Sequence, residues 1–128
     1  MIEIYFEHIE KTIQDFPCVS SYTISKKVYN TKQGFIRGVI QFEDDTHLEF
    51  VEVKDTDRSE KIKYRYQYMK KDLCLIFRYD NAPHHSHLQM FPHHKHIDKA
   101  QVKESRETTL YEVLLEIAQR IRLQKQKG

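Results

Sequence analysis

The chain has 128 residues, of which 31% are charged and 12% aromatic, and its formal net charge is +2 with the histidines neutral. This length can close one hydrophobic core, and the composition excludes a disordered tail or a fibre. No apolar run approaches the ~20 residues that cross a bilayer, and the first residues lack the features of a secretory signal. Two cysteines without C-x-x-C spacing suit a reducing compartment. We therefore predict a single cytoplasmic domain, residues 1–128, without a membrane partner.

The first predicted element is a helix of about four turns. Its apolar residues recur at alternating gaps of four and three, which places them on one face. These residues are Ile2, Phe6, Ile9, Ile13 and Phe16. Pro17 ends the helix, because proline lacks the amide hydrogen that a helix interior requires.

Alternation of apolar and polar residues then predicts an antiparallel meander of four or five strands. The predicted strands are residues 19–29, 35–42, 46–53, 61–69 and 73–79. The clearest alternation places Ile62, Tyr64, Tyr66 and Tyr68 on one face, and Lys61, Lys63 and Arg65 on the other. Polar and proline residues from about 80 to 105 predict a long loop after the last strand.

A second helix is predicted at the end of the chain. Thr109 and Glu112 form a capping box, and an apolar stripe follows. The stripe consists of Leu110, Leu114, Ile117 and Ile121. A meander with an N-terminal and a C-terminal helix on one face is a two-layer α+β fold.

The histidine-rich loop at about 80–105 is the candidate functional site. The pattern Pro-His-His-x-His occurs twice, starting at Pro83 and at Pro92, and six of the eight histidines fall between His84 and His96. Proline restricts the backbone at the start of each copy. Loops carried by a rigid sheet are a common place for binding and catalytic residues.

Three interpretations of these histidines stay open. In the first, two imidazoles act as general base and general acid in RNA cleavage through the 2′-hydroxyl, and Arg78 and Lys95 stabilise charge on phosphorus. In the second, the cluster binds zinc or another transition metal, although H-E-x-x-H spacing is missing and adjacent histidines in an extended segment point to opposite sides. In the third, the histidines are surface and packing residues without chemistry.

Contacts to a nucleic acid are predicted from the strands next to this loop. Lys63 and Arg65 are candidates for phosphate contacts, provided that their face lies beside the loop. Tyr66 and Tyr79 are candidates for stacking on a base or for donating a hydrogen bond.

Two motifs resemble the TumE family of small prokaryotic toxins. The first is Phe77-Arg78-Tyr79-Asp80-Asn81-Ala82-Pro83-His84-His85, and the second is Phe91-Pro92-His93-His94-Lys95-His96. The likeness extends to residues 34–38 and to the last helix, so it covers most of the chain. The predicted architecture is also similar to the RelE/ParE and barnase-like folds. This likeness is at the level of fold alone, so no catalytic residue is inferred from it.

The resemblance implies a toxin made beside a cognate antitoxin, itself a helix-turn-helix DNA-binding protein. Toxins of this size are often ribonucleases, so the leading hypothesis is a metal-independent endoribonuclease with RNA as substrate and no cofactor. Carried over by motif, the site residues are Arg78, Asp80, His84, His85, His93, His94, Lys95 and His96. The alternatives are a metal-dependent nuclease and a module that binds metal or a target without catalysis. Oligomeric state stays open.

Overall fold

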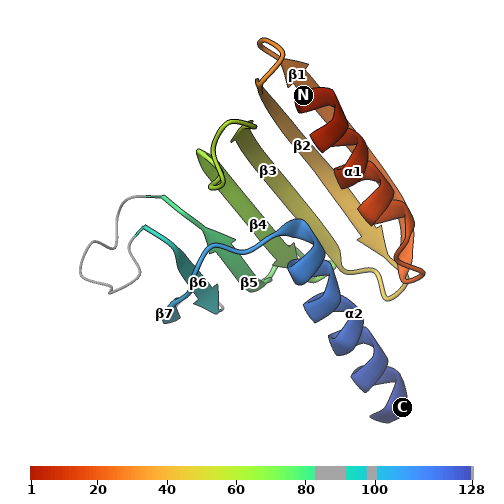
Figure 1. Cartoon of the computed structure of the whole chain (residues 1–128). Coiled ribbons are helices and arrows are strands. Elements are labelled where there is room, and N and C mark those ends of the chain that lie inside the picture. The colour runs from red at the N-terminus through yellow and green to blue at the C-terminus, as the bar shows by residue number, and fades with distance from the viewer. Residues whose placement is uncertain (83–91, 98–100, 128) are drawn as a thin grey trace.

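The computed structural model describes residues 1–82, 92–97 and 101–127 (Figure 1). Within these ranges the chain forms two helices and seven strands. They are α1 (Ile2–Gln14), β1 (Val19–Val28), β2 (Gln33–Phe42), β3 (His47–Asp55), β4 (Lys63–Met69), β5 (Leu75–Asp80), β6 (His94–Ile97), β7 (Gln101–Glu104) and α2 (Leu110–Lys127). Neither helix is long and apolar enough, over its described residues, to cross a membrane.

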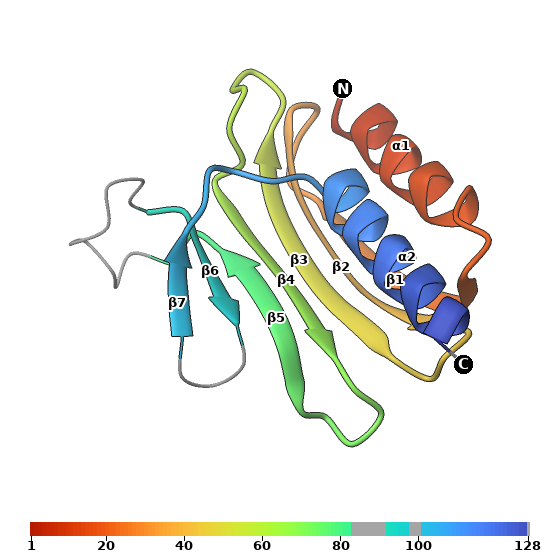
Figure 2. The same cartoon turned by 90° about the horizontal axis from the view of Figure 1, so that it is seen from below.

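All seven strands belong to one antiparallel sheet and follow one another in chain order from β1 to β7. Both helices lie on the same side of this sheet, as Figure 2 shows. We call the covered side the helix face and the other side the open face. The predicted α+β meander with a helix at each end is confirmed. One half of the predicted capping box is confirmed, because the Glu112 amide donates a hydrogen bond of 3.2 Å to Thr109 Oγ1, and the Thr109 hydroxyl in turn donates to the Glu112 carboxylate.

The sheet has more strands than predicted, because β6 and β7 lie within the segment predicted as a loop. Each of these strands has only four residues. β6 reads His-Lys-His-Ile, so both of its faces carry polar side chains and the sequence shows no apolar alternation. Pairing with β5 and with β7 holds β6 in the sheet.

The hydrophobic core lies between the helix face and the two helices. The largest buried side chains of the sheet include Tyr64, Tyr66, Tyr68, Phe42, Phe50 and Phe77. The predicted tyrosine row is therefore part of the core. Its alternation does not extend to Ile62, which is 46% exposed, because β4 begins only at Lys63.

One carboxyl group, that of Glu52 on β3, is buried in this core with no exposed surface. The Tyr66 hydroxyl donates a hydrogen bond of 2.7 Å to it, and Tyr5 of α1 donates another. Burial raises the pKa of Glu52 above its ordinary value of 4.5, although the two tyrosine hydrogen bonds and the charges of Lys61 and Lys54 act in the opposite direction. The core thus contains an acid that is costly to ionise.

We expect Tyr66→Phe to destabilise the fold by about 2 kcal/mol at neutral pH, because a hydrogen bond to a buried carboxyl is lost. Without this bond the pKa of Glu52 rises further. Stability falls with rising pH between the ordinary and the folded pKa, so this decline extends to higher pH in the variant. Urea unfolding of the wild type and Tyr66→Phe at several pH values should show a difference in the free energy of unfolding that grows from below pH 4.5 towards neutrality. A pH-independent difference would contradict the assignment to Glu52.

Candidate functional site

Strand pairing brings together four of the residues singled out in the two motifs. In the β5–β6 register, Arg78 lies opposite His96, and Asp80 lies opposite His94. Alternate residues of a strand point to the same face, so all four side chains share the open face, away from the helices. We call them the Asp80 cluster.

Asp80 contacts each of the other three side chains. Its Oδ1 lies 2.6 Å from His94 Nε2, and its Oδ2 lies 2.9 Å from Arg78 Nε and 3.4 Å from His96 Nε2. The Ala82 amide donates a further hydrogen bond of 3.0 Å to Oδ1. One buried carboxylate therefore fixes the positions of two imidazoles and one guanidinium.

The two histidines present different nitrogen atoms to their neighbours. His94 Nδ1 lies 2.9 Å from the Pro92 carbonyl oxygen, which can only accept, so Nδ1 carries a proton. His94 Nε2 lies 2.6 Å from Asp80 Oδ1, so the ring packs directly against the carboxylate. His96 Nε2 lies 3.1 Å from Arg78 Nη2, which can only donate. Arg78 therefore donates to the lone pair of His96 Nε2, whereas the His94 ring is held between the Pro92 carbonyl and Asp80.

Exposure separates the roles that these residues can have. The His94 side chain is 1% exposed and that of Asp80 is 6% exposed, whereas the values for His96 and Arg78 are 12% and 29%. A substrate on the open face can reach His96 and Arg78. Asp80 and His94 are too buried for such contact, and Asp80 holds His96 and Arg78 in position.

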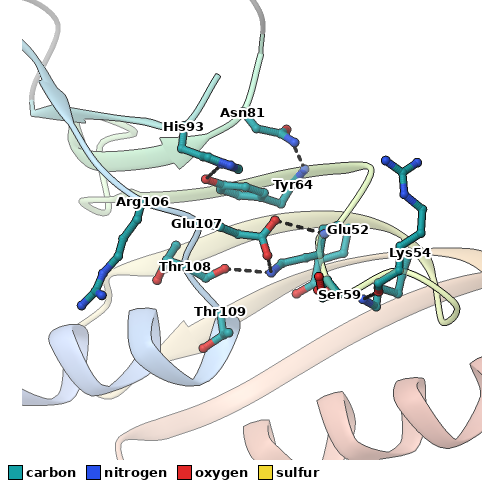
Figure 3. Close-up of polar contacts among 12 residues, drawn as sticks. Glu52, Lys54, Ser59, Tyr64, Asn81, His93, Arg106, Glu107, Thr108 and Thr109 are labelled. Atoms are coloured by element: carbon teal, nitrogen blue, oxygen red, sulfur yellow. Dashed lines mark hydrogen bonds and ion pairs between the residues drawn. The ribbon is translucent and has the colours of Figure 1, made fainter. Parts of the chain in front are cut away.

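Two other predicted site residues lie on the helix face. His93 Nδ1 is 2.9 Å from the Tyr64 hydroxyl, and the two rings stack (Figure 3). Lys95 forms an ion pair of 3.0 Å with Glu116 of α2. The structure therefore does not bring His93 or Lys95 to the Asp80 cluster. His84 and His85 lie outside the described residues.

The residues predicted to contact a nucleic acid are also divided between the two faces. Lys63 and Arg65 are exposed on the open face, and Arg65 lies opposite Asp80 in the β4–β5 register. Tyr66 is fully buried, so its ring cannot stack on a base. The half-buried Tyr79 lies on the helix face, where its hydroxyl donates a hydrogen bond to Glu116. Burial and this bond raise the pKa of Tyr79.

Comparison with known protein families matches a model described as "Toxin TumE" over residues 9–123 of the chain. The chain belongs to the TumE toxin family. A TumE toxin implies an antitoxin partner. No curated protein and no solved structure matched, so the likeness to RelE/ParE and barnase-like folds stays a prediction.

A further property of this TumE-family cluster is its donor set for a metal ion. Single ligand atoms of Asp80, His94 and His96 all lie within 4.8 Å of one another, and two imidazoles with a carboxylate suit a transition metal. The His94 ring is held through Nδ1 by a backbone carbonyl, as ligand histidines commonly are. However, the permanent positive charge of Arg78 lies 3.1 Å from His96 Nε2 and would repel a cation.

Arg37 is not among the predicted site residues, although it belongs to the same open face. Arg37 of β2 lies opposite Val51, and Val51 lies opposite Arg65. The row of strand partners continues from Arg65 through Asp80 to His94. The signal was present in the sequence, since Arg37 alternates with the buried Ile36, but only the strand register shows that it shares a row with the cluster.

Proposed function

We propose that this TumE toxin is an endoribonuclease that cleaves RNA at the Asp80 cluster without a metal ion. The observation that carries the proposal is the contact of one buried carboxylate with two imidazoles and a guanidinium, on the face of the sheet opposite α1 and α2. Imidazole transfers protons near neutral pH, and guanidinium binds phosphate oxygens.

In the proposed reaction, the ribose 2′-oxygen forms a bond to the adjacent phosphorus while the bond from phosphorus to the 5′-oxygen breaks. His96 Nε2, whose lone pair accepts a hydrogen bond from Arg78 Nη2 in the structure, accepts the 2′-hydroxyl proton once Arg78 turns to the substrate phosphate. Arg78 donates hydrogen bonds to the phosphate oxygens as their negative charge increases. The products are a 2′,3′-cyclic phosphate and a 5′-hydroxyl.

The leaving 5′-oxygen needs a proton, and a second imidazole supplies it in this proposal. His94 is buried and its Nε2 lies against Asp80, so it serves as a positioning residue. We assign the acid to the first Pro-His-His copy, His84 or His85, as the sequence predicts. Asp80 keeps the His96 ring in place and stabilises the imidazolium that forms.

The test is cleavage of a defined single-stranded RNA by the purified chain, with and without a metal chelator. We expect fragments with 2′,3′-cyclic phosphate and 5′-hydroxyl ends, formed at the same rate in both samples. The matching experiment in cells induces the toxin in a bacterial culture, where growth should stop and total RNA should show the same ends. Growth arrest with intact RNA would refute the ribonuclease assignment.

A metal-dependent nuclease is the second candidate, and the three ligand atoms within 4.8 Å favour it. In that case Asp80, His94 and His96 would hold the ion, which would supply a bound hydroxide or polarise the phosphate. Dialysis against a chelator would then abolish cleavage, and zinc or another transition metal would restore it at one equivalent per chain. Stoichiometric metal in a protein that cleaves no RNA would instead support a binding module that inhibits without catalysis.

We propose that the antitoxin is a helix-turn-helix protein, which the family resemblance supports. Co-expression of the neighbouring gene should restore growth in the induced culture. A partner that restores growth without binding DNA would contradict the proposed antitoxin class.

A further inference from the structure

A shallow depression of about 450 Å³ lies on the open face over β1 to β4. Most of its lining residues point away from the helices, since they alternate with buried residues along each strand. They include Thr23, Ser25, Arg37, Val39, Glu49, Val51 and Arg65. The proposed reaction uses none of them.

The depression is continuous with the Asp80 cluster through the strand register. Arg37, Val51, Arg65, Asp80 and His94 are successive partners in one row across β2 to β6. Neighbouring strands lie about 4.8 Å apart, so Arg65 is about 5 Å and Arg37 about 14 Å from Asp80, measured between backbones. The row leads from the cluster directly into the depression.

Cationic side chains gather on this part of the open face. Arg37 and Arg65 are exposed, and neither has an ion pair with any residue in the described part of the chain. The next row contains Lys27, Phe35, Val53 and Lys63 as successive partners, so a half-buried aromatic ring lies between two lysines. Cations beside an aromatic ring suit a single nucleic acid strand, whose phosphates and bases are both accessible.

Acidic side chains limit where phosphates can lie. Glu49 lines the depression, and Asp55 at the end of β3 accepts a hydrogen bond of 2.9 Å from Gln33. Glu49 would repel a phosphate, but it can accept hydrogen bonds from the amino groups of a base. The phosphates are therefore assigned to Arg37 and Arg65, and a base to the space beside Glu49.

Resting on the ribonuclease function proposed above, we propose that this depression binds the single-stranded RNA next to the cleaved bond. Arg37 and Arg65 contact its phosphates, and Phe35 offers a ring to one of its bases. The RNA crosses the strands along the row that ends at the Asp80 cluster. A duplex has its bases paired and stacked, so it offers neither a free base for Phe35 nor base amino groups for Glu49.

The test measures binding of a fluorescent single-stranded RNA of about 12 nucleotides to the full chain carrying His96→Ala, which prevents cleavage during the measurement. Arg37→Ala and Arg65→Ala are added separately and together. Arg122→Ala is the matched control, because Arg122 is exposed on α2, in the other layer of the fold. Melting temperatures of all variants show whether the fold is kept.

Each lost phosphate contact should reduce the slope of log affinity against log salt by about 0.7, which is about fivefold in affinity at 0.1 M salt relative to 1 M. We expect this loss for each arginine, about 25-fold for the pair if the contacts are independent, and no loss for Arg122→Ala. Duplex RNA of the same sequence should bind more weakly than the single strand.

Losses no larger than that of the control would overturn the subsite. If the wild type still cleaves RNA in that case, the ribonuclease function stands and only its RNA path is wrong. Absence of both binding and cleavage would overturn the two proposals together. If the arginine variants bind RNA normally but lose the antitoxin, the depression is a protein-docking surface and the proposal fails.

Discussion

His96→Ala should reduce the rate of RNA cleavage on the order of 100- to 10,000-fold, the range typical of losing one acid–base group. The reason is that His96 is the more exposed of the two imidazoles around Asp80, and its Nε2 faces a guanidinium that can only donate. Growth after induction and cleavage of a labelled RNA in vitro measure the effect at two levels. The fold should persist, since the lost side chain is at the surface of the cluster.

Two further variants test whether the loss of cleavage is specific to the open face of β6. His8→Ala removes an exposed histidine from α1 and should leave cleavage unchanged. Lys95→Ala removes the neighbour of His96 that points to Glu116 on the helix face, so most of the activity should remain. Equal losses for Lys95→Ala and His96→Ala would place the chemistry on the helix face or between the faces. His96→Gln serves as the second variant if the alanine protein melts early.

The sequence predicted those parts of the fold in which one face of an element is apolar. Both helices and the central strands have a clear period, because their buried sides consist of residues such as Ile9, Ile40 and Ile117. β6 has no such period, since His94 is buried by contacts with polar neighbours. Its strand is specified by pairing with β5, and pairing between distant segments leaves no local pattern.

The candidate site was predictable as a set of residues, but its division between two faces was not. Arg78, Asp80, His94 and His96 come together because each pair is two residues apart in a strand. His93 and Lys95 fall on the other face for the same reason. Residues 80–105 were predicted as a loop, and a loop has no strand alternation. The prediction therefore could not place His93 and Lys95 on a different face from His94 and His96. The sequence thus singled out the candidate residues, and their geometry follows from the sheet register.

Lys61→Met should lower the stability of the fold by about 3 kcal/mol, because it removes one partner of a buried polar cluster. The Lys61 side chain is 5% exposed, and its Nζ donates a hydrogen bond of 2.8 Å to the Thr108 carbonyl. It also lies 3.6 Å from a Glu107 oxygen, while the other Glu107 oxygen accepts a bond from the Lys61 amide. Lys61 thereby attaches the segment before α2 to the segment before β4, the region drawn in Figure 3.

The matched control is Lys63→Met, two residues further along the chain. The sequence predicted one common face for Lys61, Lys63 and Arg65, but Lys61 precedes β4 and turns into the protein, while Lys63 is exposed. Surface substitutions of this kind usually change stability by less than about 0.5 kcal/mol. Thermal unfolding should show a melting temperature on the order of 10 °C lower for Lys61→Met and nearly unchanged for Lys63→Met.

The comparison of the two lysine variants tests whether the buried polar cluster around Lys61 stabilises the fold. With Lys61 replaced, the Thr108 carbonyl loses its donor, Glu107 loses the ammonium group but keeps the bond from the backbone amide, and the buried Glu52 loses a nearby positive charge that lowers its pKa. The destabilisation should therefore be larger at neutral pH than below pH 4.5, where protonated Glu52 needs no cation. Equal melting temperatures for the two lysine variants would mean that apolar packing alone holds α2 over the sheet. A pH-dependent loss confined to Lys61→Met would show that buried charge holds the start of α2 in place.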